Sequence, residues 1–368
     1  MTDKEYIISA DYIVGVLRNM IDGSPLPEKP ADISFRMIYS LSKHHSLAST
    51  VYYYIEDEVK KEGDTALIAA WQKERDIDFV KNLKQTDEFR RLTELFTNEK
   101  ISFLPIKGFL MKALYPRPEL RTMADMDIFV SEEHIERAIN LLLERGYVCE
   151  HEIDDEGVHE ALAKPPFINV ELHRHLYQGS DYSFSDARSK EDNPYWYVME
   201  DGDFFAFILR HAKKHYTHGG CGIRAVLDIF LYKRKNSELV KSEEFINKLK
   251  ENDLYEFYVT ISALADKWFL GKESEIDISE LELYTVTGGT YGTFTNSMGF
   301  GMKEHGRFKY VFGRIFPSPK LIMQRYKWAR KCPLLVPFGY IVRIVQSLFD
   351  GRAKSHIAAV AEYEKRGK

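Results

Sequence analysis

The stretch Asp125-Met126-Asp127-Ile128-Phe129-Val130 (residues 125–130) decides how this chain folds. Its apolar residues predict a short strand, and alternate side chains of a strand point to the same face. Asp125 and Asp127 therefore share one face in this prediction. Two adjacent carboxylates are costly to bury without a cation, and they are natural ligands for Mg²⁺, which prefers oxygen donors. The alternative is a solvated junction between a loop and a strand, and the pair alone does not decide between the two.

A second short apolar run, Ile101–Ile106, is followed by Lys107, Gly108 and a predicted short helix. Gly108 allows close approach of the backbone to a phosphate, and the first N–H groups of a helix are free to bind it. Lys107 adds a positive charge for phosphate oxygens. The alternative is an ordinary turn with a surface Lys. Arg121, just upstream of the two aspartates, could reach the same site or be an ordinary surface Arg.

A third carboxylate lies in Asn169-Val170-Glu171-Leu172-His173, where alternation places Glu171 and His173 on the same face of a predicted strand. If this strand pairs with residues 126–130, Glu171 joins the two aspartates. Three acids could then hold two divalent ions, one for nucleotide phosphates and one that activates an attacking hydroxyl. Glu171 could also act as a general base. His173 could orient Glu171 or contact phosphate, or it could be a half-buried strand His with a backbone partner.

Hydrophobic periodicity predicts the organisation around these segments. Apolar side chains keep helical spacing over the first 99 residues. Strands alternate with helices over the next 70 residues or so, which indicates a compact α/β unit. Residues 285–306 are rich in Gly and Thr and predict a loop. We therefore divide the chain into four regions: an N-terminal helical region (1–99), a core (100–180), a second helical region (181–284), and a Gly-rich loop followed by a basic helical tail (285–368).

The residues above are part of a longer ordered set of motifs. In the core the set is Pro105-Ile106-Lys107-Gly108, Tyr115, Arg121, Asp125-Met126-Asp127, Gly146-Tyr147 and Glu171-Leu172-His173. In the helical regions it is His45, residues 47–53, His211, His215, Arg224 and Asp228. This set resembles the uncharacterised nucleotidyltransferase family of bacterial proteins, which belongs to the DNA polymerase β-like nucleotidyltransferase superfamily. The resemblance covers most of residues 30–235.

The resemblance implies an α+β fold, with a small mixed-sheet nucleotidyltransferase core flanked by N- and C-terminal α-helical regions. It implies transfer of a nucleoside monophosphate from an NTP to an acceptor hydroxyl, with Mg²⁺ or Mn²⁺ as cofactor and release of pyrophosphate. The acceptor could be a protein side chain, a small molecule, a sugar or RNA. We take as metal ligands and catalytic residues Asp125, Asp127 and Glu171, and as residues that contact the nucleotide Lys107, Gly108, Arg121, His173, His211 and His215.

Two residues depart from the pattern of the superfamily. Its phosphate-binding Gly-Ser is Gly108-Phe109 here, so a hydroxyl donor is missing, and Lys107 could compensate. Its third acid is Glu171 in place of Asp, which lengthens the side chain by one methylene. A non-catalytic module that uses the same fold to bind a nucleotide or a partner protein is therefore an alternative function.

A second alternative is a zinc hydrolase. His211 and His215 are four residues apart and lie on one face of a predicted helix, with Asp228 as a candidate third ligand. No Glu follows His211, so the usual general base of a zinc protease is absent. The preferred interpretation is that this helix, which also carries Lys213 and Lys214, lines a phosphate-binding cleft opposite the aspartates.

Charge is divided unevenly along the chain. The net charge is −5, but residues 303–368 hold 15 Lys and Arg against 4 Asp and Glu, a net of +11, which leaves −16 for the rest. This basic tail could be a solvated face, bind an acidic partner such as RNA, or lie on an anionic membrane surface. Three scattered Cys indicate a reducing compartment, and the longest apolar stretch, 333–342, is too short to span a bilayer. We expect a soluble cytoplasmic protein.

Overall fold

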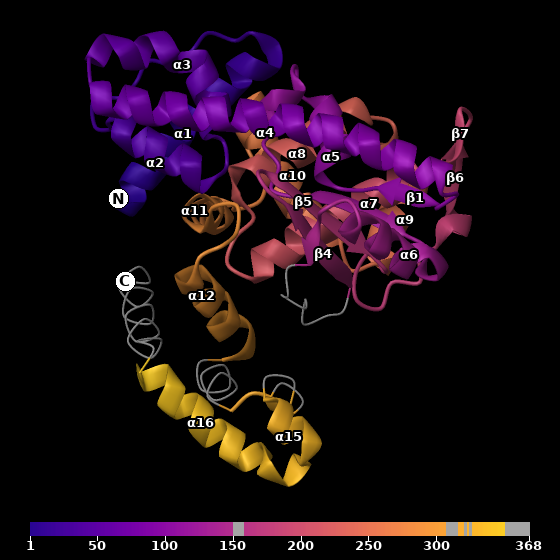
Figure 1. Cartoon of the computed structure of the whole chain (residues 1–368). Coiled ribbons are helices and arrows are strands. Elements are labelled where there is room, and N and C mark those ends of the chain that lie inside the picture. The colour runs from indigo at the N-terminus through magenta and orange to yellow at the C-terminus, as the bar shows by residue number, and fades with distance from the viewer. Residues whose placement is uncertain (150–157, 307–315, 320–321, 324–325, 350–368) are drawn as a thin grey trace. The chain divides into compact units, whose positions relative to one another are not determined.

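The computed structural model describes residues 1–149, 158–306, 316–319, 322–323 and 326–349 (Figure 1). The chain forms two compact units. The first unit comprises residues 1–213 and 223–283, and the second comprises residues 214–222 and the described residues from Tyr284 onwards. Among the described residues, no helix combines the length and the apolar character that crossing a bilayer requires. The four regions divided on sequence stay predictions.

Four helices form the N-terminal part of the first unit, as the periodicity predicted. A capping box starts the first helix, because the Thr2 and Glu5 side chains each accept a hydrogen bond from the other's backbone N–H. The long fourth helix extends from this helical part across the sheet (Figure 1). The four are α1 (Asp3–Asp22), α2 (Phe35–His44), α3 (Ala48–Glu62) and α4 (Thr65–Asn98).

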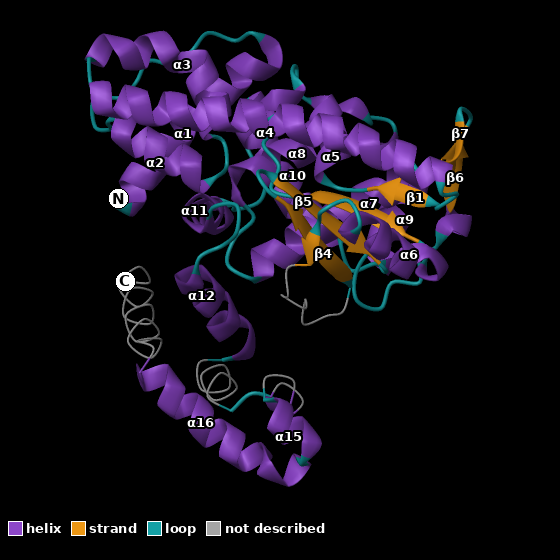
Figure 2. Cartoon of the chain, in the orientation of Figure 1, coloured by secondary structure: helices purple, strands orange, loops and turns teal. Residues whose placement is uncertain are grey.

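A seven-stranded mixed sheet follows (Figure 2). Its strands are β1 (Phe103–Pro105), β2 (Met126–Val130), β3 (Val148–Cys149), β4 (His159–Lys164), β5 (Ile168–His173), β6 (Ala187–Lys190) and β7 (Asn193–Met199), in the spatial order β3-β4-β5-β2-β1-β7-β6. β2 is parallel to β5, and β1 is parallel to β7, whereas the other neighbours are antiparallel. The predicted α+β class, a mixed sheet between helical regions, is confirmed.

The two faces of the sheet differ in chemistry. One face packs against α4 and against α6 (Glu132–Leu143) in an apolar core. Because side chains alternate along a strand, the intervening residues of β2 and β5, Asp127, Phe129, Glu171 and His173, lie on the opposite face. The apolar core contains Met126, Ile128 and Val130 from β2, Val170 and Leu172 from β5, Leu92 and Phe96 from α4, and Ile135, Ile139 and Leu142 from α6.

Strands β6 and β7 correct the prediction that residues 181–284 are helical. β6 is short and polar, whereas β7 contains the β-favouring run 195–199, a strand signal that the helical prediction overlooked. β7 is ordered by long-range contacts: Phe103 pairs with Trp196, and their ring centroids are 5.7 Å apart. The helices of this region are α7 (Asp201–Thr217), α8 (Gly222–Lys235), α9 (Glu243–Glu251), α10 (Tyr255–Leu270) and α11 (Ser279–Gly288).

The second unit corrects the predicted Gly-rich loop over residues 285–306. Helix α12 (Phe294–His305) begins there, and the side chain of Thr293 caps it by accepting a hydrogen bond from the N–H of Asn296. The helix includes two glycines, which lower helix propensity without preventing a helix. Further along are α15 (Lys327–Lys331) and α16 (Val336–Phe349). Two helices thus form in the described part of the predicted tail, while 307–315 and 350–368 lie outside the described residues.

Candidate active site

The pairing of β2 with β5 brings two predicted site residues together. Asp127 is directly opposite Glu171 in the register, and Phe129 is opposite His173. Nε2 of His173 lies 3.0 Å from Oδ1 of Asp127 and 3.4 Å from Oε2 of Glu171. The conditional prediction that these two strands are neighbours is therefore confirmed. His173 is a buried partner of the two carboxylates, so the interpretation that it orients Glu171 fits better than a backbone partner does.

Lys107 reaches the same carboxylates from the turn after β1. Its ammonium nitrogen is 2.5 Å from Oδ1 of Asp127 and 3.8 Å from Oε2 of Glu171. The side chain is only 17% exposed, so the alternative of a surface Lys is wrong. The backbone of Lys107 has a φ of 52°, in the left-handed region that favours Gly. Strained residues of this kind occur preferentially at functional sites.

Gly108 is required by the packing of this turn. It begins α5 (Gly108–Met111), and a Cβ atom built on it would lie 2.9 Å from Nη1 of Arg121 and 3.0 Å from Sδ of Met123. Its carbonyl oxygen accepts a hydrogen bond from the same Nη1, at 3.0 Å. The close approach that a glycine permits is thus used by protein side chains. Its predicted contact with phosphate stays a prediction.

Arg121 is buried in an ion pair with Asp228, and its predicted contact with phosphate stays a prediction. Its Nε donates to Oδ1 of Asp228 at 2.9 Å, and its Nη2 donates to Oδ2 at 2.7 Å. The hydroxyl of Tyr115 also donates to Oδ1 of Asp228, at 2.8 Å. Each nitrogen of the guanidinium therefore already has a protein acceptor, since Nη1 binds the carbonyl of Gly108. Arg121 supports the Lys107–Gly108 turn from behind.

The same ion pair corrects the zinc hydrolase interpretation. Both carboxylate oxygens of Asp228 accept hydrogen bonds from Arg121, so Asp228 does not serve as a third zinc ligand. His211 and His215 do lie four residues apart on α7, as predicted. Their proposed contact with substrate is not tested by the structure and stays a prediction.

Within the part of the chain that the structure describes, one group of three side chains has metal-ligand spacing. It consists of His159, Glu171 and His173. The sequence of residues 147–153 and 157–163 predicts a hairpin that includes His159, but it assigns this residue no role. The signal that could have found it is the antiparallel register of β4 and β5, which pairs His159 with His173 directly. Residues 150–157 of the predicted hairpin lie outside the described residues.

The surroundings shift the pKa values of the two aspartates in opposite directions. Burial alone would raise the pKa of Asp127, but the charge of Lys107 and the hydrogen bond with His173 hold it well below its usual range. Burial and the neighbouring charges of Asp127 and Glu171 raise the pKa of Asp125 to about 7. Burial would also lower the pKa of Lys107, but the nearby carboxylates outweigh it and raise it. The carboxylates thus form a site of excess negative charge beside a single ammonium.

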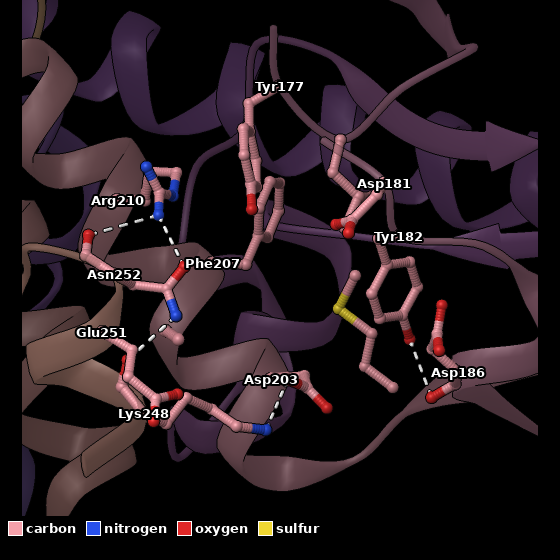
Figure 3. Close-up of a pocket in the computed structure, with 13 residues that line it drawn as sticks. Tyr177, Asp181, Tyr182, Asp186, Asp203, Phe207, Arg210, Lys248, Glu251 and Asn252 are labelled. Carbon is pink, nitrogen blue, oxygen red and sulfur yellow. Dashed lines mark hydrogen bonds and ion pairs between the residues drawn. The ribbon is translucent and has the colours of Figure 1, made fainter. Parts of the chain in front are cut away.

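A pocket of about 350 Å³ is lined by Tyr182 and twelve further residues (Figure 3), and it lies next to Phe129 of β2. The ring of Phe129 contacts the ring of Tyr182 at a centroid distance of 6.3 Å, and Tyr182 lines the pocket. The guanidinium of Arg210 lies over the ring of Tyr177 at 4.3 Å on another side. The lining consists of Leu176, Tyr177, Asp181, Tyr182, Asp186, Met199, Asp203, Ala206, Phe207, Arg210, Lys248, Glu251 and Asn252.

The two cations of this pocket are already paired. Lys248 forms an ion pair of 2.6 Å with Asp203, and Arg210 donates to Oδ1 of Asn252 at 2.8 Å (Figure 3). Asp181 and Glu251 also line the pocket, and no ion pair of either is seen among the described residues. The lining is therefore acidic and aromatic.

Comparison with known protein families identifies the family of this chain. A family model described as an uncharacterised nucleotidyltransferase matches residues 32–270, a span that includes the whole sheet and all the site residues above. No curated protein matches the chain.

Proposed function

Because the chain belongs to the uncharacterised nucleotidyltransferase family, and is therefore a nucleotidyltransferase, we propose that it works with divalent ions held by Asp125, Asp127 and Glu171. In this proposal it transfers a nucleoside monophosphate from an NTP to an acceptor hydroxyl. The observation that supports it most is the register that pairs Asp127 with Glu171 on adjacent parallel strands. This register concentrates carboxylates at one place on the sheet, next to Asp125.

The residues fit a divalent cation. The pKa of Asp125 is raised to about 7 by burial and by the charges of Asp127 and Glu171, so the ionised carboxylates repel one another. Lys107 supplies only one positive charge against the three carboxylates. A bound cation would remove this repulsion. When bound, Mg²⁺ or Mn²⁺ neutralises phosphate charge and lowers the pKa of the attacking hydroxyl.

The protein's own side chains would position the reactants. Lys107 would donate to a phosphate oxygen of the NTP, since its ammonium lies at the carboxylate cluster and Lys is a common ligand of phosphate. His173 would hold Asp127 in place through the 3.0 Å contact of Nε2. Glu171, which is partly exposed, could take the proton of the acceptor. The acceptor oxygen then forms a bond to the α-phosphorus while the bond to pyrophosphate breaks, and pyrophosphate leaves.

The pocket next to Phe129 is the proposed acceptor site. Asp127 and Phe129 lie two residues apart on one face of β2, a separation of about 6.6 Å along a strand. A volume of about 350 Å³ suits a small molecule or a single side chain. Asp181 and Glu251 favour an acceptor with positive charge, and they disfavour RNA, whose phosphates they would repel. We therefore propose a small hydroxyl-bearing acceptor that carries an amine.

The test is transfer of label. The full chain is incubated with each NTP labelled at the α-phosphate, with Mg²⁺ or Mn²⁺, and with lysate separated into small molecules and macromolecules. We expect label in a new small-molecule product, and loss of that product in Asp127→Asn. Tight nucleotide binding without transfer from any NTP would favour the non-catalytic binding module. Transfer that persists unchanged in Asp127→Asn would overturn the proposed site.

A further inference from the structure

We propose that His159, Glu171 and His173 form a separate ion site that takes a divalent transition metal, such as Mn²⁺, Co²⁺ or Zn²⁺, beside the two aspartates. The inference deepens the proposed function, because Glu171 would be shared between this site and the aspartates. It does not depend on transfer activity, since the ion would bind without a nucleotide. The proposal is that the chain selects a metal that accepts imidazole ligands over Mg²⁺.

The strand register brings the three side chains together. His159 of β4 is directly opposite His173 of β5, and their ring centroids are 5.0 Å apart. Oε1 of Glu171 lies 3.6 Å from Nε2 of His159, and Oε2 lies 3.4 Å from Nε2 of His173. The candidate ligand atoms of the three side chains all lie within 4.8 Å of one another. Ligands bound at about 2.1 Å are separated by roughly 3–4 Å, so small side-chain movements suffice to close the site.

The burial of His173 is an independent observation. The side chain is 2% exposed, and among the described residues its Nδ1 has no hydrogen-bond partner. Buried polar atoms are nearly always partnered, so an orphaned nitrogen calls for an explanation. Because Nδ1 has no hydrogen-bond partner among the described residues, no contact at that atom fixes the tautomer of the His173 ring. With the proton on Nε2, His173 donates to Asp127, as in the hydrogen bond described above; with the proton on Nδ1, the lone pair of Nε2 faces the same carboxylates and is available to an ion between them.

Charge and ligand type point to the class of metal. The carboxylates of Asp127 and Glu171 outnumber the single ammonium of Lys107, and this excess negative charge favours a bound cation beside neutral imidazoles. Mg²⁺ binds oxygen ligands almost exclusively, whereas imidazole suits Mn²⁺, Co²⁺ and Zn²⁺. Two imidazoles beside carboxylates therefore favour a transition metal.

Cobalt binding tests the proposal directly. The metal-free full chain is titrated with Co²⁺ without nucleotide, and the visible absorption of the bound ion is followed. We expect His159→Ala to weaken Co²⁺ binding at least ~10-fold, since loss even of a residue that only supports a ligand costs about that much. His175→Ala is the matched control, because His175 is an exposed His two residues after His173. Circular dichroism checks that both variants are folded.

The outcomes separate this inference from the proposed function. Co²⁺ affinity that is unchanged in His159→Ala, or that falls equally in His175→Ala, would overturn the ion site even if label transfer is intact. Binding that depends on His159 in a chain that transfers no label would support the ion site and argue against the proposed reaction. A Mg²⁺ affinity equal to that for Mn²⁺ would contradict the proposed selectivity.

Discussion

The ammonium nitrogen of Lys107 lies 2.5 Å from Oδ1 of Asp127. The backbone of Lys107 is in the left-handed region at a φ of 52°, a strain of about 1–3 kcal/mol that the rest of the turn must offset. An ammonium and a divalent ion are attracted to the same carboxylates. In the proposed site, Lys107 therefore competes with the metal until its ammonium moves to a phosphate oxygen.

Replacing Lys107 should separate metal binding from catalysis. In Lys107→Met we expect Mn²⁺ to bind about 5- to 10-fold more tightly without nucleotide, because roughly 1 kcal/mol of competing ion pairing is gone. Label transfer should fall by at least ~100-fold, because a charge that stabilises the transferred phosphate is lost. Electron paramagnetic resonance of free Mn²⁺ measures the first effect. Lys73→Met, at an exposed Lys, is the control, and weaker Mn²⁺ binding in Lys107→Met would contradict the competition.

The Arg121–Asp228 pair should be a major contributor to stability. Arg121→Met leaves the carboxylate of Asp228 buried without its cation, which costs about 3–5 kcal/mol for a buried pair. The double variant Arg121→Met/Asp228→Asn removes that charge too and should recover part of the loss. Urea unfolding measures both free energies. A loss below about 1 kcal/mol in the single variant would show that the pair is not an important support of the turn.

Lys112 should make stability depend on pH. Burial and the charges of Arg121 and Lys81 lower the pKa of Lys112 to about 8. The unfolded chain binds a proton there up to about pH 10.4, so the unfolded state holds more protons between these values. The free energy of unfolding therefore rises with pH across this window, by on the order of 3 kcal/mol. In Lys112→Met this rise should be absent. A difference between wild type and variant that does not change with pH would contradict it.

The acidic side chains of the pocket should contribute to the affinity for the acceptor. Once label transfer has identified a small acceptor, Asp181→Asn should raise the KM for that acceptor by about 2- to 5-fold, the size of a partly exposed charge pair. The KM for the NTP should not change. Asp192→Asn, at an exposed Asp outside the pocket, is the control. An increase in the KM for the NTP instead would place the nucleotide, not the acceptor, in the pocket.

The helical tail predicts binding to anionic lipid. Leu334, Phe338, Ile341 and Val345 recur at helical spacing near and along α16, and all are exposed. With the basic sequence around them, such a face favours an anionic surface. Ile341→Glu should lower the fraction that sediments with phosphatidylglycerol vesicles, while Gln346→Glu, an equal charge change off this stripe, should lower it less. If both variants lowered sedimentation equally, or if the chain bound neutral vesicles equally well, the tail would be an ordinary solvated surface.

The parts of the site formed by residues close together in the sequence were predictable. The β2 strand and the alternation of Glu171 with His173 follow from residues a few positions apart, and both appear in the structure. The partner of Arg121 did not follow, because Asp228 lies 107 residues away and an ion pair at that separation leaves no local pattern. His159 was missed for the same reason, since its role depends on strand register.

In the fold, too, local features were predictable and long-range contacts were not. The N-terminal helices and the core strands have a clear periodicity of apolar residues. β7 carries a β-favouring run at 195–199, but its place beside β1 and the contact of Trp196 with Phe103 join residues far apart in the sequence, so no local pattern reveals them. Helix α12 includes glycines that by propensity favour a loop; its cap at Thr293 offsets part of that cost, and the burial of Met298 adds to the stabilisation.

The most direct test of the account compares wild type with Asp127→Asn, using one NTP labelled either at the α- or at the γ-phosphate. We predict that only the α-label reaches the acceptor, and that the rate falls at least ~100-fold in Asp127→Asn. The exposed Asp57→Asn should transfer at the wild-type rate. Transfer of the γ-label, or an unchanged rate of α-label transfer in a folded Asp127→Asn, would contradict nucleotidyl transfer at this site.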